Sequence, residues 1–439
     1  MSFERTVAHD LWPLGLMRAR AGARAPAVEV ARPASFEDVA GLLSSGRRLI
    51  PMGGGSGVCG AVWPAAGDMV LDMGALAHVD IDETNLIVRA GSGVNGLALE
   101  QRLNERGLTL GHFPSSLPVA TIGGLVSTRS SGQESSRHGG VEDMVLGLTV
   151  ALENGTIVEA RPHPRSAAGP SLHQLFIGAE GALGVVLEAV LRVHRLPESV
   201  IGRGWRLPAV GPGLKAMREV MQHDLRPLVL RLYDPEDSAF QGFGGGCLLV
   251  AAVAGPTPVA EAEAKLVADL IGANGGQPLG EPPWAHLLAH RFDLSADRLR
   301  DFLEPPGAFL DTIEVAAAWS TLQGLYEEIK ANLASGADLA LCHFSHPYAQ
   351  GCCAYFTFAG SAPDEAAAEA AYLSCWRGTM EIALRRGATI SHHHGIGQVR
   401  APWVRAELHG WWEVWRRVRR ALDPSDKLNP NAMGGREPN

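Results

Sequence analysis

Three consecutive histidines form the most unusual local signal in this 439-residue chain. They occupy residues 392–394 and precede a glycine. Imidazoles titrate near neutral pH, so they can exchange protons, contact a cofactor, bind a metal or simply lie on a polar surface. Adjacent side chains diverge, so a metal would need partners elsewhere, such as His343 and His346. We expect proton transfer or cofactor contact here and assign no metal ligand.

A tyrosine and an arginine in strand-like segments are the other candidates for chemistry. Tyr355 lies in the apolar run 354–358, where packing is the ordinary role of a tyrosine. Beside a redox cofactor, its hydroxyl with a lowered pKa could instead take a proton from a substrate. Arg231 lies between Leu230 and Leu232, where a cation is costly unless it is paired. Arg231 therefore either meets a carboxylate in the fold or binds an anionic substrate.

Loops rich in glycine and serine recur through the first ~195 residues. Consecutive glycines at 53–57 can adopt positive φ angles and direct several backbone amides at one anion, and Ser56 can add a hydroxyl donor. Several such loops in one domain suit a large, extended ligand that carries phosphates. The later loops are residues 114–118, 121–132, 137–140 and 178–184.

The first of these loops also matches a dinucleotide fingerprint formally. Residues 55–60 read GxGxxG, but that fingerprint needs a helix whose first amides face the pyrophosphate. Pro64 and Gly67 leave no room for such a helix. We therefore predict no nicotinamide site of the Rossmann type.

The predicted helices and strands that must position these residues follow two different patterns along the chain. Before about residue 195, Ser35 can cap a helix over 36–43, the strand 48–52 runs into the glycine loop, and 144–160 reads as a hairpin turning at Asn154-Gly155. After about residue 200, strands alternate with amphipathic helices, which suggests a separate layered domain. The strands are expected at 228–232, 247–253, 312–316, 339–343 and 354–358, and the helices at 259–271, 322–333 and 363–385.

Composition limits the class of protein. The 38 Lys and Arg residues against 47 Asp and Glu give a net charge of −9, which argues against nucleic acid as the main partner. The hydrophobic share of 46% excludes a disordered chain. Six scattered cysteines without a CxxC pair favour a reducing compartment. With no signal-peptide core and no apolar run of about 18 residues, we expect a cytoplasmic protein without a transmembrane segment.

Taken in order, the glycine loops resemble the FAD-binding domain of the vanillyl-alcohol oxidase / p-cresol methylhydroxylase flavoprotein superfamily. The resemblance implies an α+β, two-domain flavoprotein: an FAD-binding domain at 1–198, an antiparallel-sheet substrate (cap) domain at 199–390, and a segment 391–439 that returns to the FAD domain. Some relatives attach flavin through a histidine in the first loop; that loop has none here, which implies non-covalent FAD. His138 lines the cofactor or lies in a surface loop. The cofactor-binding residues that the resemblance implies are Pro51, Gly53, Gly54, Gly55, Ser56, Gly57, Pro114, Ser115, Thr121, Gly123, Gly124, Ser127, Thr128, Ser131, Gly132, His138, Gly139, Glu180, Gly181, Gly184, Val185 and Asn429.

The later segments are similar to alkylglycerone-phosphate synthases, and more loosely to the glycolate oxidase D subunit and D-lactate dehydrogenases. The resemblance rests on residues 345–356, 392–397 and 428–430. It departs in two places: the synthases carry a long N-terminal helical extension where about 25 residues precede the flavin domain here, and the glycolate and lactate enzymes tend to have Glu-His-Gly at 393–395. The catalytic residues that it implies are Tyr355, His392, His393, His394 and Arg231.

We therefore expect an FAD-dependent oxidoreductase that transfers hydride from a small hydroxylated, anionic substrate, such as a 2-hydroxy acid, to flavin N5. Arg231 would hold the anion, and Tyr355 or a histidine of 392–394 would take the hydroxyl proton. The alternative is non-redox alkyl transfer on a dihydroxyacetone phosphate ester through a flavin adduct, as in ether lipid synthesis. A histidine-rich metal hydrolase would be colourless, and an inactive flavoprotein would hold a flavin that no substrate reduces. The electron acceptor is open, and a homodimer is compatible with the Trp-rich helix around Trp411, Trp412 and Trp415, which we expect mainly to pack on the FAD domain.

Overall fold

The computed structural model describes residues 1–23, 25–293 and 296–435, and it divides into two compact units. Unit 1 comprises 1–130, 140–196 and the described residues from 393 onward. Unit 2 comprises 131–139 and the described residues of 197–392. The short segment 131–139, which the sequence placed in the FAD domain, thus clusters with unit 2. No described helix is both long and apolar enough to cross a membrane.

Unit 1 is built on two sheets. The first has the order β1-β2-β4-β3, in which β2, β4 and β3 run parallel and β1 pairs antiparallel at the edge. The second is antiparallel with the order β5-β6-β10-β8-β9. The strands are β1 (Ser2–Thr6), β2 (Val28–Arg32), β3 (Leu49–Met52), β4 (Met69–Asp72), β5 (Val79–Asp82), β6 (Ile87–Gly91), β8 (Val145–Ala151), β9 (Ile157–Glu159) and β10 (Val185–Arg192), with a small ribbon of β7 (Leu108–Thr109) and β11 (His194–Arg195).

One helix of unit 1 begins at a side-chain cap that the sequence predicted. Ser35 accepts a hydrogen bond from the amide of Asp38 at 3.1 Å, which confirms the predicted cap of α2. The predicted hairpin is confirmed as β8 paired with β9. The helices are α1 (Pro13–Arg20), α2 (Phe36–Leu43), α3 (Gly96–Asn104), α4 (Ile122–Thr128), α6 (Val141–Met144), α14 (Ala401–Leu408) and α15 (Trp411–Leu422), with 3-10 turns η1 (Met73–Ala75), η2 (Leu172–Phe176) and η3 (Ala432–Gly434).

The end of the chain closes the core of unit 1. Leu428 forms an isolated parallel bridge with Leu49 of β3 and is fully buried. It packs in one apolar cluster with Leu43 of α2, Leu71 of β4 and Leu187 of β10. Since burying a leucine contributes roughly 2 kcal/mol, this contact holds the C-terminal segment on the sheet that carries the glycine loop.

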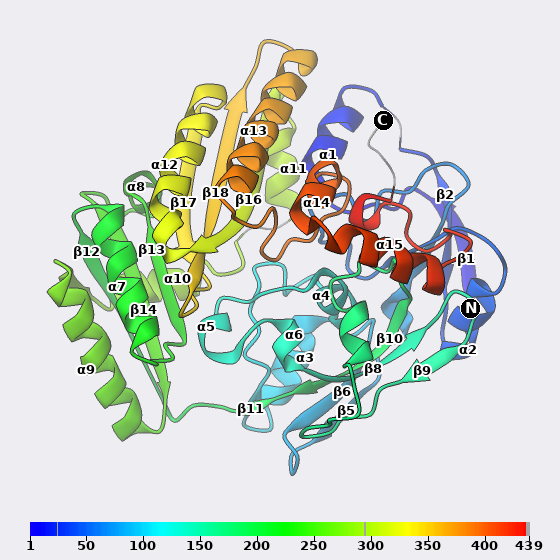
Figure 1. The fold of residues 1–439 in the computed structure, drawn as a ribbon, viewed down its shortest axis with the longest axis horizontal. Helices are drawn as coiled ribbons and strands as arrows, with labels where there is room; N and C mark the ends of the chain where they lie inside the picture. The colour runs from blue at the N-terminus through cyan, green and yellow to red at the C-terminus, as the bar shows by residue number, and fades with distance from the viewer. Residues whose placement is uncertain (24, 294–295, 436–439) are drawn as a thin grey trace. The chain divides into compact units, whose positions relative to one another are not determined.

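Unit 2 is a seven-stranded antiparallel sheet with the order β15-β12-β14-β13-β17-β18-β16. Figure 1 shows helices α7, α9, α12 and α13 lying along this sheet. The strands are β12 (Ser199–Leu207), β13 (Val229–Tyr233), β14 (Cys247–Gly255), β15 (Gln277–Gly280), β16 (Ala308–Ala318), β17 (Leu339–Ser345) and β18 (Gly351–Ser361). The helices are α5 (Ser135–His138), α7 (Val210–Gln222), α8 (Pro235–Phe240), α9 (Thr257–Ala273), α10 (Pro282–Ala289), α11 (Ala296–Leu303), α12 (Trp319–Gly336) and α13 (Glu365–Arg385).

The two faces of this sheet differ in character. Leu232, Phe344 and Phe356 point toward the helices. Gly213 of α7 lies against Leu232, and the ring of Tyr326 of α12 is stacked on Phe356 and tilted against Phe344. Side chains alternate along a strand, so their neighbours point to the opposite face. That alternation decides which residues can form a site.

Candidate active site

Two glycine-rich loops of unit 1 approach each other so closely that side chains are excluded. A Cβ atom on Gly53 would lie 2.1 Å from Thr121 Oγ1, and one on Gly54 would lie 1.9 Å from the carbonyl oxygen of Val119. The Thr121 hydroxyl is buried and has no hydrogen-bond partner among the described residues. No helix follows Gly60 before β4, as predicted, so this loop is no Rossmann fingerprint. Backbone amides beside an unpartnered hydroxyl suit an anionic group such as a phosphate.

The loop before β10 also lies close to the end of β3, and both carry predicted cofactor-binding residues. Gly181 has a φ of 80°, and a Cβ there would lie 3.0 Å from Cγ of Pro51. Asn429 donates a hydrogen bond from Nδ2 to the carbonyl oxygen of Glu180 at 2.6 Å. A Cβ on Gly123, in the first turn of α4, would lie 2.5 Å from Ser92 Cβ. These contacts place the loops after β3 and before β10 beside the C-terminal segment, a narrow arrangement that fits an extended cofactor.

Glu180, one of the predicted cofactor-binding residues, holds the C-terminal segment through its side chain. Its buried carboxylate accepts hydrogen bonds from the amides of Ile396 at 2.8 Å, Gly397 at 3.0 Å and Met433 at 3.4 Å. Burial raises the pKa of this carboxyl, although these amides and Arg400 oppose the shift. The side chain therefore fixes the segment after the three histidines, while the backbone amide of Glu180 donates to the carbonyl oxygen of Ser127 at 2.9 Å and its carbonyl oxygen accepts from Asn429.

The remaining predicted cofactor residues divide between the units. Thr128 donates its hydroxyl to the carbonyl of Gly124 within α4, and Gly184 lies against Val150 in the sheet core. Ser131, Gly132, His138 and Gly139 belong to the segment that clusters with unit 2.

Two buried titratable residues of unit 1 were missed by sequence reasoning. His112 is 1% exposed, its Nε2 lies 3.3 Å from the Ser130 hydroxyl, and its Nδ1 has no partner among the described residues. Burial lowers the pKa of His112 to about 4. Burial raises the pKa of Asp10, which lies beside Gly57, to about 7. The position of His112 two residues before Pro114 was a usable signal, whereas Asp10 offered none.

In unit 2, four polar or aromatic residues face one another across neighbouring strands. Tyr233 pairs with His343, His343 with Tyr355, and Tyr355 with Glu314. Directly opposed residues share a face, so these four form a row on the face opposite helices α7 and α12. Arg231, two residues before Tyr233, points to the same face, with its guanidinium carbon 5.0 Å from the Tyr233 ring centroid. We call these five residues the polar row.

Arg231 is held by a histidine and not by a carboxylate. Its Nη2 donates to His343 Nε2 at 2.7 Å, and His343 Nδ1 lies 3.3 Å from Asp237 Oδ2. Since arginine only donates, His343 Nε2 must accept, which leaves the proton on Nδ1 directed at Asp237. Burial, with the charge of Arg231, lowers the pKa of His343 to about 4, so the ring is neutral.

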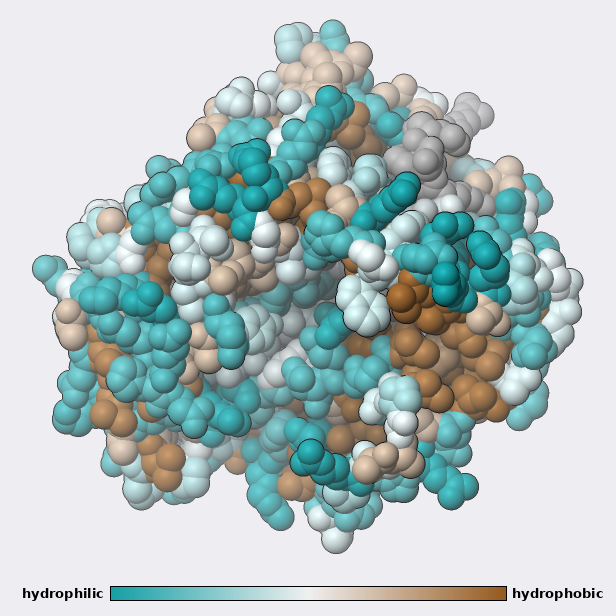
Figure 2. Space-filling view, viewed as in Figure 1, coloured by the Kyte–Doolittle hydropathy of each residue, from teal (hydrophilic) through white to brown (hydrophobic). Residues whose placement is uncertain are grey.

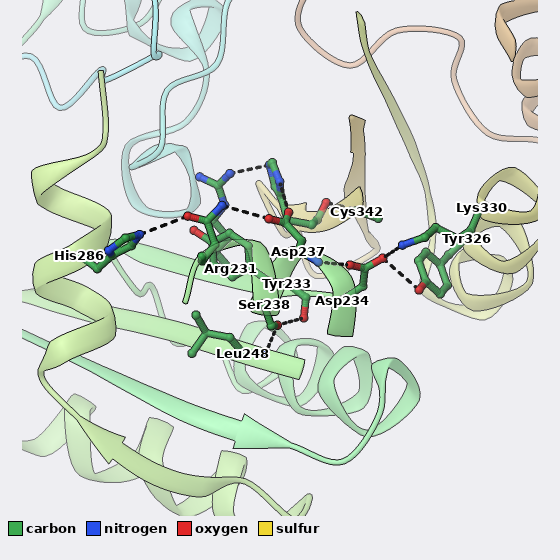
Figure 3. A network of polar contacts seen from close by, with 12 residues as sticks. Arg231, Tyr233, Asp234, Asp237, Ser238, Leu248, His286, Tyr326, Lys330 and Cys342 are labelled. Carbon is green, nitrogen blue, oxygen red and sulfur yellow. Dashed lines mark hydrogen bonds and ion pairs between the residues drawn. The ribbon is translucent and has the colours of Figure 1, made fainter. Parts of the chain in front are cut away.

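The local sequence explains why Asp237 lies there. Asp234 caps α8 by accepting from the amide of Asp237 at 2.8 Å, and Pro235 follows at the first helical position. Lys330 and Tyr326 of α12 both bind the Asp234 carboxylate (Figure 3). The cap fixes the first turn of α8, and that turn presents Asp237 to His343. Sequence reasoning recognised Arg231 but missed this support.

Tyr355 stacks on His343, with ring centroids 4.7 Å apart and planes inclined by 15°. Burial raises the pKa of Tyr355 above its usual value, with Glu314 contributing and a hydrogen bond to Thr312 opposing, whereas the role of a base would need a lowered pKa. The phenol is therefore protonated at neutral pH. It can donate a hydrogen bond but does not rest as a base.

His392 belongs to a second group in unit 2. Its ring stacks on His346 at 5.1 Å, its Nε2 lies 2.8 Å from the Tyr348 hydroxyl, and its amide donates to Glu314 Oε1 at 3.2 Å. His346, at a φ of 51°, has Nδ1 2.6 Å from the Ser135 hydroxyl. Glu314 thus links the polar row to the first of the three histidines. The next two histidines, His393 and His394, belong to unit 1, where their rings meet edge-on at 4.5 Å.

Comparison with known families identifies the chain. Residues 196–433 match the model of the C-terminal domain of FAD-linked oxidases, and residues 27–161 match an FAD-binding domain model. The chain belongs to the FAD-linked oxidase family. FAD is its cofactor, and it is an enzyme of the oxidoreductase type. The glycine loops of unit 1, which exclude side chains at Gly53 and Gly54, fit that cofactor.

Several members of the FAD-linked oxidase family are similar along most of the chain. An alkyldihydroxyacetonephosphate synthase of Dictyostelium discoideum is 30% identical, covering 91% of this chain and 72% of its own length. An FAD-linked oxidoreductase of Escherichia coli is 31% identical, covering 83% and 79%. The glycolate oxidase subunit GlcD of Bacillus subtilis is 27% identical, covering 88% and 83%.

Solved structures agree with the two-domain flavoprotein fold. An alkyldihydroxyacetonephosphate synthase superimposes with a TM-score of 0.81 at 26% identity, covering 97% of this chain and 81% of that one. A p-cresol methylhydroxylase gives 0.77 at 14% identity, covering 92% and 88%, and supports the fold alone.

Proposed function

We propose that this FAD-linked oxidase oxidises a small hydroxylated anion such as a 2-hydroxy acid. The observation that carries the proposal is the state of Arg231. Its guanidinium has no carboxylate within ion-pair distance among the described residues, and its Nε is buried without a partner. A cation whose contacts are a neutral histidine and an aromatic ring retains most of its charge for a substrate carboxylate, which it can bind through two parallel hydrogen bonds.

Tyr355 and a histidine of 392–394 would perform the remaining steps. Tyr355, whose raised pKa keeps it protonated, would donate a hydrogen bond to the substrate oxygen and orient it. A histidine of 392–394 would then take the hydroxyl proton, since neutral imidazole is the better base near pH 7. Bound FAD, held non-covalently, supplies the two-electron acceptor for the substrate hydride. The glycine loops of unit 1 would bind its phosphates.

A second candidate is non-redox alkyl transfer on a dihydroxyacetone phosphate ester. The observation in its favour is the 30% identity with an alkyldihydroxyacetonephosphate synthase over 91% of this chain. Arg231 would then bind a phosphate in place of a carboxylate, because a guanidinium fork matches both anions. The same side chains serve either reaction, so substrate turnover must separate them.

The deciding experiment is an anaerobic absorbance spectrum of the FAD-loaded protein, titrated with glycolate, D-lactate and D-2-hydroxyglutarate. We expect the oxidised flavin bands to bleach with one of these acids. In a parallel reaction, an acyl-dihydroxyacetone phosphate and a long-chain alcohol are supplied, and ether product is measured. Ether product with the flavin left oxidised would establish the second candidate. If no acid bleaches the flavin bands and the acyl-dihydroxyacetone phosphate is not consumed, both candidates are contradicted.

A further inference from the structure

The helix α15 (Trp411–Leu422) is strongly amphipathic. It holds three of the ten tryptophans of the chain. Trp411, Trp415, Val418 and Leu422 recur at helical spacing and mark one apolar side, with Val414 beside them. The opposite side carries Arg416, Arg417, Arg420 and Glu413.

The body of unit 1 covers only part of this apolar side. The helix packs on unit 1, as the sequence suggested, but no residue of α15 is fully buried. Trp412, Trp415 and Leu422 are half-buried, whereas Trp411 is 72% and Val414 45% exposed. An apolar flank of the helix therefore extends past its packed side into solvent. Figure 2 shows hydrophobic side chains gathered next to hydrophilic ones where Figure 1 places α15.

The charge of α15 is opposite to that of the molecule. Four arginines against one glutamate give the helix +3, in a chain whose net charge is −9. Arg417 pairs with Glu413 at 3.1 Å across an exposed surface, and such a pair is weak. Arg420 is exposed and has no ion-pair partner among the described residues. The polar side can therefore exchange its few internal contacts for an external anion.

We propose that α15 docks the protein on the surface of a membrane that contains anionic phospholipids. Tryptophan suits the boundary between headgroups and acyl chains, since its ring is apolar and its N–H is polar. Trp411 and Val414 would enter that boundary, while Arg417 and Arg420 contact phosphates at headgroup depth. A second copy of the chain is a poorer occupant, because two α15 helices placed face to face would bring two +3 charges together.

The test measures flotation of the full-length, FAD-loaded protein with vesicles. One set contains equal parts of phosphatidylglycerol and phosphatidylcholine, and the other contains phosphatidylcholine alone. We expect the protein to float with the anionic vesicles at about 50 mM NaCl and to be released at about 500 mM, since salt screens the arginines. Trp411→Ser with Val414→Ser, and separately Arg417→Glu with Arg420→Glu, should each weaken binding at least about tenfold.

The matched control is Arg47→Glu with Arg106→Glu, which reverses two arginines of unit 1 that are each paired with one exposed carboxylate. This control should float like the unaltered protein, and all variants should keep their FAD content. Equal flotation of the α15 variants and the control would overturn the proposal. So would absence of flotation combined with a dimer that Trp411→Ser and Val414→Ser dissociate, because a second copy would then occupy the helix. The readout is independent of turnover and therefore of the proposed reaction.

Discussion

Two other residues hold the guanidinium of Arg231 in place. Asp237 orients His343, and His343 presents a single unprotonated nitrogen that fixes the guanidinium in one place. Because His343 stays neutral, the chain positions the arginine without cancelling its charge. Asp237 and His343 are therefore positioning residues, while Arg231 is the group proposed to touch the substrate.

Replacing Arg231 with Ala should weaken the binding of an anionic substrate by about 10- to 100-fold, because charge-assisted hydrogen bonds are lost. The measurement is the dissociation constant from flavin absorbance changes, with the neutral amide of the same substrate as control. The variant His343→Gln should keep nearly the wild-type affinity, because an amide can accept from Arg231 and donate to Asp237. The variant His343→Leu should bind the anionic substrate about tenfold more weakly. An undiminished affinity in His343→Leu would remove the positioning role.

Tyr355→Phe should lower turnover by about 10²- to 10⁴-fold, because the hydrogen bond that orients the substrate oxygen is lost. The ring still stacks on His343, so the flavin spectrum and the thermal midpoint should stay close to wild type. Single-turnover flavin reduction measures the effect directly. Turnover retained within a factor of about two would assign Tyr355 to packing alone.

The loops that follow β3 and precede α4 show how elements constrain residues. Gly53 and Gly54 follow strand β3 and lie against the turn that ends at Thr121. The two segments are so close that a side chain on either glycine would overlap that turn. Glycine is required here by that close approach, since the Gly54 Cβ would overlap a carbonyl oxygen, and a backbone cannot yield as a flexible side chain can.

Gly54→Ala should therefore reduce FAD retention sharply, and Gly54→Asp should abolish it by adding negative charge beside the phosphates. Flavin bound per protein after gel filtration, with and without added FAD, is the measurement. Gly41→Ala in α2, where a Cβ meets nothing within 4 Å, is the matched control and should retain FAD fully. Full FAD content in Gly54→Asp would place the phosphates elsewhere.

At the scale of the whole molecule, each unit holds a buried histidine whose pKa lies well below its usual value. The pKa of His112 in unit 1 and that of His343 in unit 2 are both lowered to about 4, with burial as the first cause. In the unfolded chain both return to about 6.5. As the pH falls below about 6.5, the unfolded state takes up protons that the folded state refuses, so stability is lost until about pH 4. The full contribution, about 3 kcal/mol for each histidine, is present only above pH 6.5.

His112→Asn should therefore flatten the pH dependence of unit 1. Between pH 7 and pH 5, wild type should lose about 2 kcal/mol that the variant does not lose. Comparison with the variant is needed because Asp10, whose pKa is raised to about 7, acts in the opposite direction over this range. Urea unfolding followed separately for each transition measures it, and parallel pH curves for wild type and variant would contradict the prediction.

Local patterns in the chain were enough for the elements and for the cofactor. The Ser35 cap, the Asn154-Gly155 hairpin and the long strands of unit 2 depend on neighbours in sequence, so spacing and residue type predicted them. The family and FAD followed from the order of several glycine loops, each weak alone.

Properties set by contacts far apart in sequence required the folded molecule. Strand pairing put Arg231 beside His343, 112 residues away, and made a neutral histidine its partner where sequence allowed a carboxylate or a substrate. Burial raises the pKa of Tyr355, and Glu180 accepts hydrogen bonds from backbone amides more than 200 residues further along the chain. The solvent exposure of Trp411 and Val414 on α15 could not be predicted from the local sequence pattern. Desolvation and pairing are sums over all neighbours in space, and those neighbours exist only once the chain has folded.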